Sequence, residues 1–381
     1  MKREPIARAL SPEEQVLLGA IRLDRAQDAR LRELLGSGVP VGRGLDWAAL
    51  RQMAQGHGVS PLVYARLQAL GETLLPEGER ARWATFYRAN ARHNLYLARR
   101  LLRVLDLLTG GGVEALPFKG PVLALQAYGD LSRREFNDLD ILVRPRDFRP
   151  AHELLTRAGY RPLFSTEDER QRRWVPLGRG PEGGQAPRGA RPAGHLAFAE
   201  GDCTLELHWA TAPGFLAQPS AAEMFWQGTQ SVELLGRTVR TFSPQNTLLL
   251  LCLHGARHRW GELRWIADLA QLVERTPEGA WSPLLAQGEE LGMRRILGLG
   301  LCLAEEPGGA ALPGLVRARV HEDRGARRLA ALIQGWFRGD MLQSPAMGLA
   351  HRLSFDLRSR ERWRDRLRYL LARAQAWPPG D

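Results

Sequence analysis

Two carboxylates stand one residue apart at the start of an apolar segment. Asp138 and Asp140 belong to the stretch FNDLDILVRP, residues 136–145, whose apolar residues are typical of a buried strand. Side chains alternate between the two faces of a strand, so both carboxylates point to the same face. Like charges a few ångströms apart repel one another, and the pair therefore predicts that a cation lies between them.

A third carboxylate is available on a neighbouring predicted strand. Residues 195–209 predict a hairpin that turns at Gly201-Asp202, and its second arm places Glu206 on one face with His208. Three carboxylates around an open position suit Mg²⁺, which binds few protein oxygens and keeps sites for water and phosphate. Either Glu206 or Asp202 can be the third carboxylate. Two interpretations of His208 have equal weight: it contacts Glu206 and supports it from beside the site, or it is an exposed residue of the strand.

A basic turn precedes the carboxylates and is suited to phosphate. Lys119-Gly120-Pro121 separates a short apolar run from a brief helix, and a helix N-terminus offers free N–H groups to anions. Gly120 permits a close backbone approach, and Arg133 and Arg134 add positive charge. Lys119 is informative because only it and Lys2 are lysines in a chain otherwise rich in arginine.

The elements that position these residues predict an α+β fold. We expect a small mixed β-sheet core over residues 111–242, flanked by an N-terminal helical region, 1–110, and a C-terminal helical region, 243–381. Residues 354–375 predict one arginine-rich amphipathic helix. The segment 177–194, dense in Gly, Pro and Arg, predicts a mobile loop that is either a solvated insertion or an arginine-bearing flap.

Composition excludes several classes of protein. With 44% hydrophobic and 25% charged residues, the 381-residue chain is typical of globular proteins. Its longest apolar run, residues 248–253, is too short to span a bilayer, and no signal peptide is visible, so we expect a cytoplasmic protein without a membrane partner. Three widely spaced cysteines indicate reduced thiols. The net charge is +11, but the sequence has no dense basic run interleaved with aromatic residues, so no stable nucleic-acid partner is inferred.

Three segments together resemble a known family. These are residues 118–160, with FKGPVLALQAYGDLSRREFNDLDILV at their start, then LELHW, and then SPQNTLLLLCLHGARHRWGELRWIADLAQLVER. The chain resembles bacterial nucleotidyltransferases of uncharacterised substrate, a branch of the DNA polymerase β-like nucleotidyltransferase superfamily. The resemblance extends from the N-terminal helices to the arginine-rich end.

The resemblance implies roles for individual residues. Asp138 and Asp140 would bind two Mg²⁺ ions, and Glu206 would be the third catalytic carboxylate and general base for the acceptor hydroxyl. Lys119-Gly120 stands where the superfamily has a Gly-Ser turn that holds the triphosphate. The segments HGxxHxW and LRWxxD imply further contacts with the nucleotide or the acceptor in the same cleft, and the arginine upstream of the carboxylates is expected to join them. These residues are Arg134, His254, His258, Arg264, Trp265 and Asp268.

The resulting hypothesis is an Mg²⁺-dependent enzyme that transfers an NMP from an NTP to an acceptor hydroxyl and releases pyrophosphate. Two alternatives stay open. One is a tailoring or toxin-like nucleotidyltransferase that modifies a peptide or a tRNA, for which the +11 charge would be suited. The other is a catalytically silent nucleotide-binding scaffold, against which the three acidic residues argue. A zinc site at His254 and His258 is not favoured, because the pair lacks the glutamate of HExxH and a third ligand.

Overall fold

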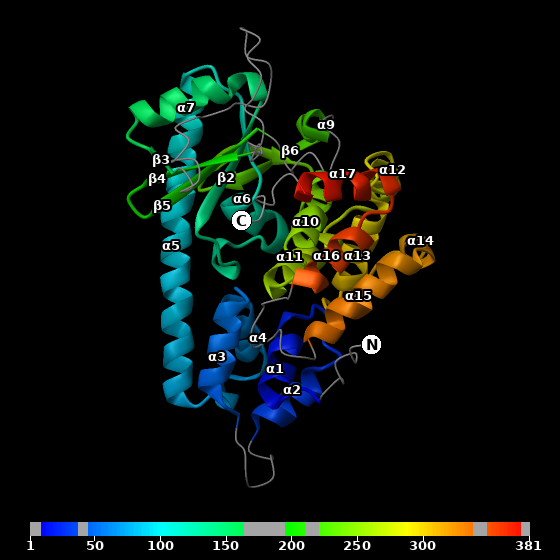
Figure 1. Cartoon of the computed structure of the whole chain (residues 1–381). Helices are drawn as coiled ribbons and strands as arrows, with labels where there is room; N and C mark the ends of the chain where they lie inside the picture. Colours follow the sequence, from blue (N-terminus) through cyan, green and yellow to red (C-terminus); the bar gives the residue numbers. More distant parts are fainter. Residues whose placement is uncertain (1–8, 37–44, 164–194, 210–220, 338–348, 375–381) are drawn as a thin grey trace, which may run out of the picture. The chain divides into compact units, whose positions relative to one another are not determined.

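The computed structural model describes residues 9–36, 45–163, 195–209, 221–337 and 349–374 (Figure 1). The predicted loop at 177–194 lies outside the described residues. The chain forms two compact units, each assembled from separate segments. Unit 1 comprises Met1–His93, Ala127–Glu135 and Leu248–Glu361, and unit 2 comprises Asn94–Gln126, Phe136–Thr247 and Arg362–Asp381. The predicted region boundaries at 110 and 242 stay a prediction.

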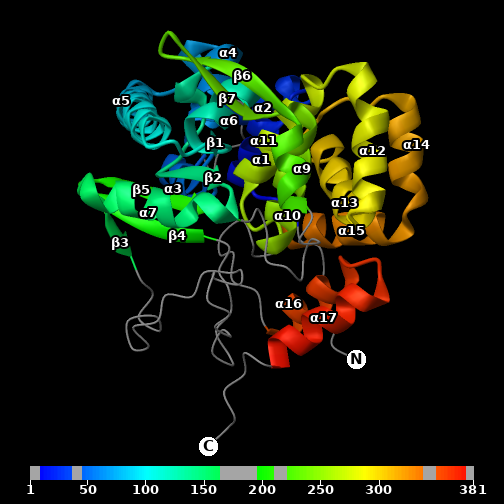
Figure 2. The same ribbon diagram turned by 90° about the horizontal axis from the view of Figure 1, so that it is seen from above.

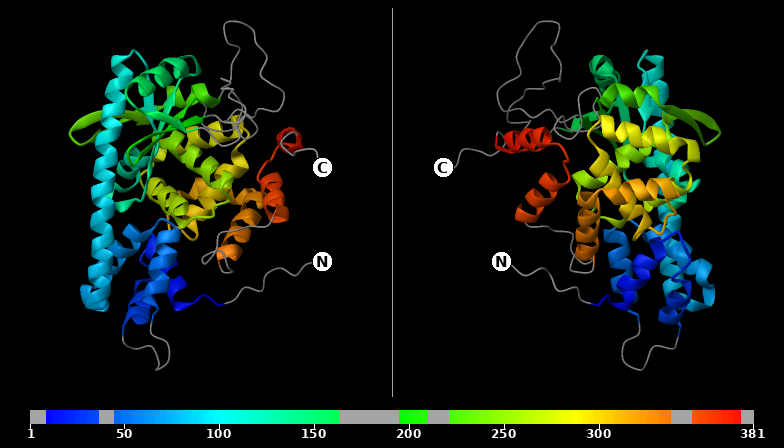
Figure 3. Two further views of the ribbon diagram at one scale, coloured as in Figure 1. Left: turned by 60° about the vertical axis from the view of Figure 1, so that its left-hand side comes forward. Right: turned by 90° about the vertical axis from the view of Figure 1, so that its right-hand side faces the viewer.

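Unit 1 contains only helices within its described residues. Its first segment holds α1 (Pro12–Ile21), α2 (Asp28–Leu35), α3 (Trp47–Gly56), α4 (Ser60–Leu70), η1 (Glu72–Leu74) and the beginning of α5 (Glu77–Gly110), and its short second segment holds η2 (Leu131–Arg133). Its third segment holds most of α10 (Pro244–Arg257), then α11 (Leu263–Glu274), η4 (Glu278–Ala280), α12 (Trp281–Glu290), α13 (Arg294–Glu305), α14 (Gly314–Glu322), α15 (Arg324–Phe337) and α16 (Leu349–Arg358). Figure 3 shows these helices in two further views.

Local sequence explains where the first helix begins. Ser11 precedes α1, with Pro12 in the first turn, and its hydroxyl accepts a hydrogen bond from the Glu14 N–H. The Glu14 carboxylate in return accepts from the Ser11 N–H at 2.8 Å. This capping box satisfies two N–H groups that a helix start leaves without partners, as the Ser-Pro-Glu-Glu pattern predicts.

Unit 2 is built on a five-stranded sheet. Its strands are β1 (Ala115–Pro117), β2 (Asp138–Val143), β3 (Arg161–Leu163), β4 (His195–Glu200) and β5 (Cys203–His208), in the order β1-β2-β5-β4-β3. Only the β2–β5 pairing is parallel, so the sheet is mixed. The unit also holds most of α6 (Gly120–Tyr128), η3 (Pro145–Asp147), α7 (Phe148–Arg157), α9 (Ala221–Gln227), a hairpin of β6 (Thr229–Leu234) and β7 (Arg237–Phe242), and α17 (Trp363–Ala374). The predicted α+β class with a mixed sheet is confirmed.

The two faces of the sheet differ in chemistry. One face is apolar: the ring of Phe148 on α7 packs edge-on against Trp209 at 4.3 Å, and the His152 ring packs against Phe198 on β4. Figure 2 shows α7 lying along β4 and β5. The opposite face carries the alternate residues of β2, β5 and β4, which include the predicted carboxylates. Burial of the apolar face therefore fixes which way these carboxylates point.

The prediction of one helix over 354–375 is wrong, because α16 ends at Arg358 and α17 begins at Trp363. No glycine or proline marks the break. The Asp356 carbonyl accepts hydrogen bonds from the Ser359 hydroxyl, at 3.0 Å, and from the Arg360 guanidinium. In a continuous helix that carbonyl would accept from the backbone N–H four residues on, so these side chains replace a helical bond.

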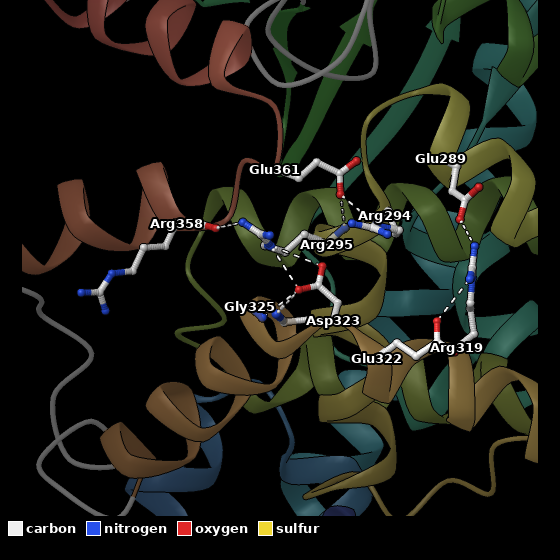
Figure 4. A network of polar contacts seen from close by, with 10 residues as sticks. Glu289, Arg294, Arg295, Arg319, Glu322, Asp323, Gly325, Arg358 and Glu361 are labelled. Carbon is white, nitrogen blue, oxygen red and sulfur yellow. Dashed lines mark hydrogen bonds and ion pairs between the residues drawn. The ribbon is translucent and has the colours of Figure 1, made fainter.

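A residue within the break caps another helix. Glu361 accepts a hydrogen bond from the Arg295 N–H at 3.0 Å, in the first turn of α13 (Figure 4). Met293, which precedes α13, supplies no side-chain cap of its own. The Arg295 guanidinium in turn donates to the Arg358 carbonyl and to Asp323. Segment 359–361 is therefore held by α13, and a carboxylate at a helix N-terminus also suits the helix dipole.

Within the described residues, no helix combines the length and the apolar character needed to cross a membrane.

Candidate active site

The Asp138-x-Asp140 pair lies at the start of β2, as predicted. Asp140 is in register with Glu206 on the parallel neighbour β5, and Asp138 is in register with Thr204. Asp140 is only 2% exposed, whereas Asp138 and Glu206 are half-buried. The structure therefore brings Asp140 and Glu206 to adjacent positions on one face of the sheet, with Asp138 one step along the same strand.

Cations of the chain itself lie beside these carboxylates. Lys119 Nζ donates to Asp140 Oδ1 at 3.1 Å. His208 Nε2 lies 3.1 Å from the same oxygen and 3.2 Å from Glu206 Oε2, so its ring bridges two carboxylates. His208 is buried, which decides against the interpretation of an exposed strand histidine. Lys119 and His208 therefore lie beside Asp140, and the cation expected between Asp138 and Asp140 stays a prediction.

The pKa values of the cluster follow from this arrangement. Burial alone would raise the pKa of Asp140, but the Lys119 ammonium and the His208 ring outweigh it and hold that pKa well below its usual range. The hydrogen bond from His208 lowers the pKa of Glu206, against the opposing effects of burial and of Asp140. Burial would lower the pKa of His208, yet its bonds to both carboxylates raise it. Both carboxylates are consequently ionised at neutral pH.

One oxygen of Asp140 has no partner. Asp140 Oδ2 is buried and accepts no hydrogen bond, although Oδ1 accepts two. A buried charged oxygen without a partner is unfavourable unless a bound ligand supplies the missing contact. This free oxygen, together with the ionised neighbours, fits a divalent cation that prefers carboxylate ligands.

The turn before α6 brings two chain segments into close contact. Gly120 has a positive φ of 53°, and a Cβ at this position would lie 3.1 Å from the Asp138 carbonyl oxygen. Glycine is favoured here because it adopts this conformation without steric conflict. The predicted close approach at Gly120 is therefore to the backbone of β2, and the Phe118 N–H donates to the Asp140 carbonyl nearby. Its role in holding a triphosphate stays a prediction.

Sequence reasoning missed His195 on β4. Its Nε2 lies 3.9 Å from Glu206 Oε2, and its ring stacks on that of His208 with centroids 4.9 Å apart. Among the described residues, His195, Glu206 and His208 form the group whose ligand atoms are close enough to hold a metal ion. The hairpin turn at Gly201-Asp202 was a usable signal, because a two-residue turn fixes the register that places His195 opposite His208.

The remaining predicted residues belong to unit 1. Arg134 is buried, and its Nε donates to both carboxylate oxygens of Asp268, at 3.2 and 3.0 Å. Asp268 is fully buried and also accepts from the Tyr128 hydroxyl at 2.9 Å. Burial and the nearby Asp268 raise the pKa of Tyr128, which keeps that hydroxyl protonated. Arg134 and Asp268 thus hold each other inside the unit, and their contact with a nucleotide stays a prediction.

The histidine pair forms a ring cluster with Trp265. The rings of His254 and His258 lie 4.6 Å apart, and each lies within 5.4 Å of the Trp265 ring. Arg264 pairs with Glu262 at 2.6 Å and packs near the same tryptophan, with its Cζ 6.0 Å from the ring centre. The expected one-turn spacing of the histidines is confirmed. That this group and the carboxylates of unit 2 line one cleft stays a prediction.

A mixed sheet with acidic side chains on one face, and a lysine beside them in the turn before α6, defines the class: an α+β protein with a candidate cation and phosphate site. The family model for uncharacterised nucleotidyltransferases matches residues 43–309, and the chain belongs to this family. A nucleotidyltransferase-like antigenic protein from Paracoccidioides brasiliensis has a crystal structure that is similar at 14% identity and a TM-score of 0.32, over 60% of this chain and 97% of that one. The curated proteins gave no match.

Proposed function

We propose that this protein is an Mg²⁺-dependent nucleotidyltransferase of the DNA polymerase β-like type, which transfers an NMP from an NTP to an acceptor hydroxyl and releases pyrophosphate. Membership in a nucleotidyltransferase family supports the reaction class. The observation that carries the proposal is the unpartnered buried oxygen of Asp140, which lies in register with an ionised Glu206. A catalytically silent scaffold would have no use for such a carboxylate.

The residues fit an acidic metal site. Asp138, Asp140 and Glu206 would hold Mg²⁺, with Asp140 Oδ2 as the free ligand oxygen. When bound, two Mg²⁺ ions stabilise the charge on the attacking and leaving oxygens of a phosphoryl displacement. Glu206 is also our candidate for the base that accepts the proton of the acceptor hydroxyl. Its lowered pKa keeps it ionised, and His208 holds its carboxylate in place.

The turn at Lys119 and Gly120 is proposed to bind the triphosphate. α6 begins at Gly120, and the first N–H groups of a helix suit phosphate oxygens. The Lys119 ammonium lies beside the start of this helix and adds a positive charge. From unit 1 we propose contacts with the base or the acceptor by His254, His258 and Arg264.

Calorimetry of each of the four NTPs with the full-length protein tests the proposal, with and without Mg²⁺. We expect Mg²⁺-dependent binding that Asp140→Asn weakens at least tenfold. Asp202→Asn is the matched control, because Asp202 is an exposed residue of the β4–β5 turn and should bind as the wild type does. Release of pyrophosphate, followed with candidate acceptors, then reports transfer. Absence of Mg²⁺-dependent binding for all four NTPs, or unchanged binding by Asp140→Asn, would overturn the proposal.

A further inference from the structure

Two histidines and a glutamate converge on the polar face of the sheet. His195 on β4 lies directly opposite His208 on β5, and Glu206 precedes His208 by two residues on the same face. Both imidazole Nε2 atoms point at Glu206 Oε2, from 3.9 and 3.2 Å. Three potential ligands thus come from one antiparallel hairpin, and all three ligand atoms lie within 4.8 Å of one another.

The geometry points to a second, chemically distinct cation site: we propose that His195, Glu206 and His208 bind a first-row metal ion of the Zn²⁺ or Co²⁺ type. Imidazole nitrogens suit these ions, whereas Mg²⁺ takes oxygen ligands. Ligand atoms about 2.0–2.1 Å from a tetrahedral ion lie about 3.4 Å apart, close to the two spacings found here. Two imidazoles and one carboxylate leave a fourth position open, which is the ligand set of catalytic rather than structural zinc sites.

The rings are already oriented by packing. The His208 ring meets Phe118 edge-on at 5.0 Å and stacks on His195 at an interplanar angle of 27°. Ligands whose orientation is fixed by neighbouring groups bind metal ions more tightly than mobile ones. On binding, the ion would take the place of the proton that His208 shares with Glu206 and Asp140, and that proton would leave to solvent.

The site is separable from the proposed Mg²⁺ position. Asp138 and the free Oδ2 of Asp140 are not among the three ligands, and only Glu206 belongs to both sets. The inference does not depend on nucleotidyl transfer, because binding of the ion is measured without NTP. If the ion is present during catalysis, Glu206 would be shared between two cations, an arrangement known in two-metal sites.

Titration of the metal-free, full-length protein with Co²⁺ tests the inference, at about pH 8, where free imidazole is neutral. We expect visible absorption bands of four- or five-coordinate Co²⁺ with one equivalent bound, which Zn²⁺ abolishes and excess Mg²⁺ does not. His195→Ala should weaken Co²⁺ binding at least tenfold, and His195→Gln provides a second variant of similar size. His351→Ala is the matched control, since His351 is exposed on α16 and outside the group.

Each result has a definite meaning. Asp138→Asn should keep the Co²⁺ spectrum even where it loses Mg²⁺-dependent NTP binding, which separates this inference from the proposed function. Circular dichroism and the thermal midpoint establish that each variant is folded. Co²⁺ binding that is absent, that Mg²⁺ displaces readily, or that His195→Ala and His195→Gln leave unchanged would overturn the assignment.

Discussion

The buried pair of Arg134 and Asp268 gives a sharp prediction about stability. Asp268 is 0% exposed and accepts three hydrogen bonds, two from Arg134 Nε and one from the Tyr128 hydroxyl. Asp268→Ala removes the carboxylate that the buried Arg134 guanidinium and the Tyr128 hydroxyl both contact. Removing one partner of a buried ion pair costs about 3–5 kcal/mol of the free energy of unfolding.

The expected shift in melting temperature is large. A change of 1 kcal/mol moves the midpoint of a unit of this size by about 2–4 °C, so Asp268→Ala should lower it by about 6–20 °C. Differential scanning calorimetry or thermal circular dichroism measures the shift. The double variant Arg134→Met/Asp268→Leu should recover much of it, because no buried charge then lacks a partner.

An exposed ion pair provides the comparison. Glu289 accepts from Arg319 at 2.8 Å on the surface of unit 1, and both side chains are about half exposed (Figure 4). Glu289→Ala should leave the midpoint nearly unchanged, since solvent screens such pairs. The reasoning fails if Asp268→Ala lowers the midpoint no more than Glu289→Ala does. In that case Asp268 would be free to contact a ligand, as its sequence motif implies.

Three further predictions concern single positions. Gly120→Ala should destabilise the protein by at least about 1 kcal/mol, because alanine resists a positive φ and its Cβ would press on the Asp138 carbonyl; urea unfolding measures this. Burial raises the pKa of Glu135, so the folded state favours its protonated form. The stability that this carboxyl contributes is fully present below about pH 4.3, its usual pKa, and is lost as the pH rises through the raised pKa of the folded state. Glu135→Gln should therefore gain stability relative to wild type as the pH rises above about 4.3, and equal curves would refute this. Glu361→Ala should remove the cap of α13 at a cost of about 0.5–2 kcal/mol and speed hydrogen exchange at the Arg295 N–H, and unchanged exchange would contradict that role.

The sequence was informative wherever a local rule decides the structure. β2 spans Asp138–Val143, inside the stretch predicted as a strand, since a run of apolar residues indicates a buried strand and the period of two sets the face of its carboxylates. The turn at Gly201-Asp202 and the bend at Gly120 follow from the conformational freedom of glycine, and both have positive φ. Each of these features depends on residues a few positions apart, and the pattern of a single chain contains that information.

Features that depend on residues far apart in the chain could not be predicted from the sequence. Arg134 and Asp268 are 134 residues apart, and neither the charge pattern nor the spacing indicates that they pair and become buried. The break after Arg358 depends on Asp356, whose carbonyl is taken by side chains, and on Glu361, which caps a helix more than sixty residues earlier. This break contains neither glycine nor proline. Tertiary contacts, rather than local helix propensity, end the helix there.

Strand register favours Glu206 over Asp202 as the third carboxylate of the proposed site. Alternation alone leaves Glu206 and Asp202 equivalent, since both have the same parity on the hairpin's second arm. In the structure Asp140 pairs with Glu206, and Asp202 lies four residues before it, in the turn. Four residues of strand span about 13 Å, which is far beyond the reach of one ion that also binds Asp140. The effect of Glu206→Gln on Mg²⁺-dependent binding, against the neutral Asp202→Asn, therefore tests the parallel pairing of β2 and β5 itself.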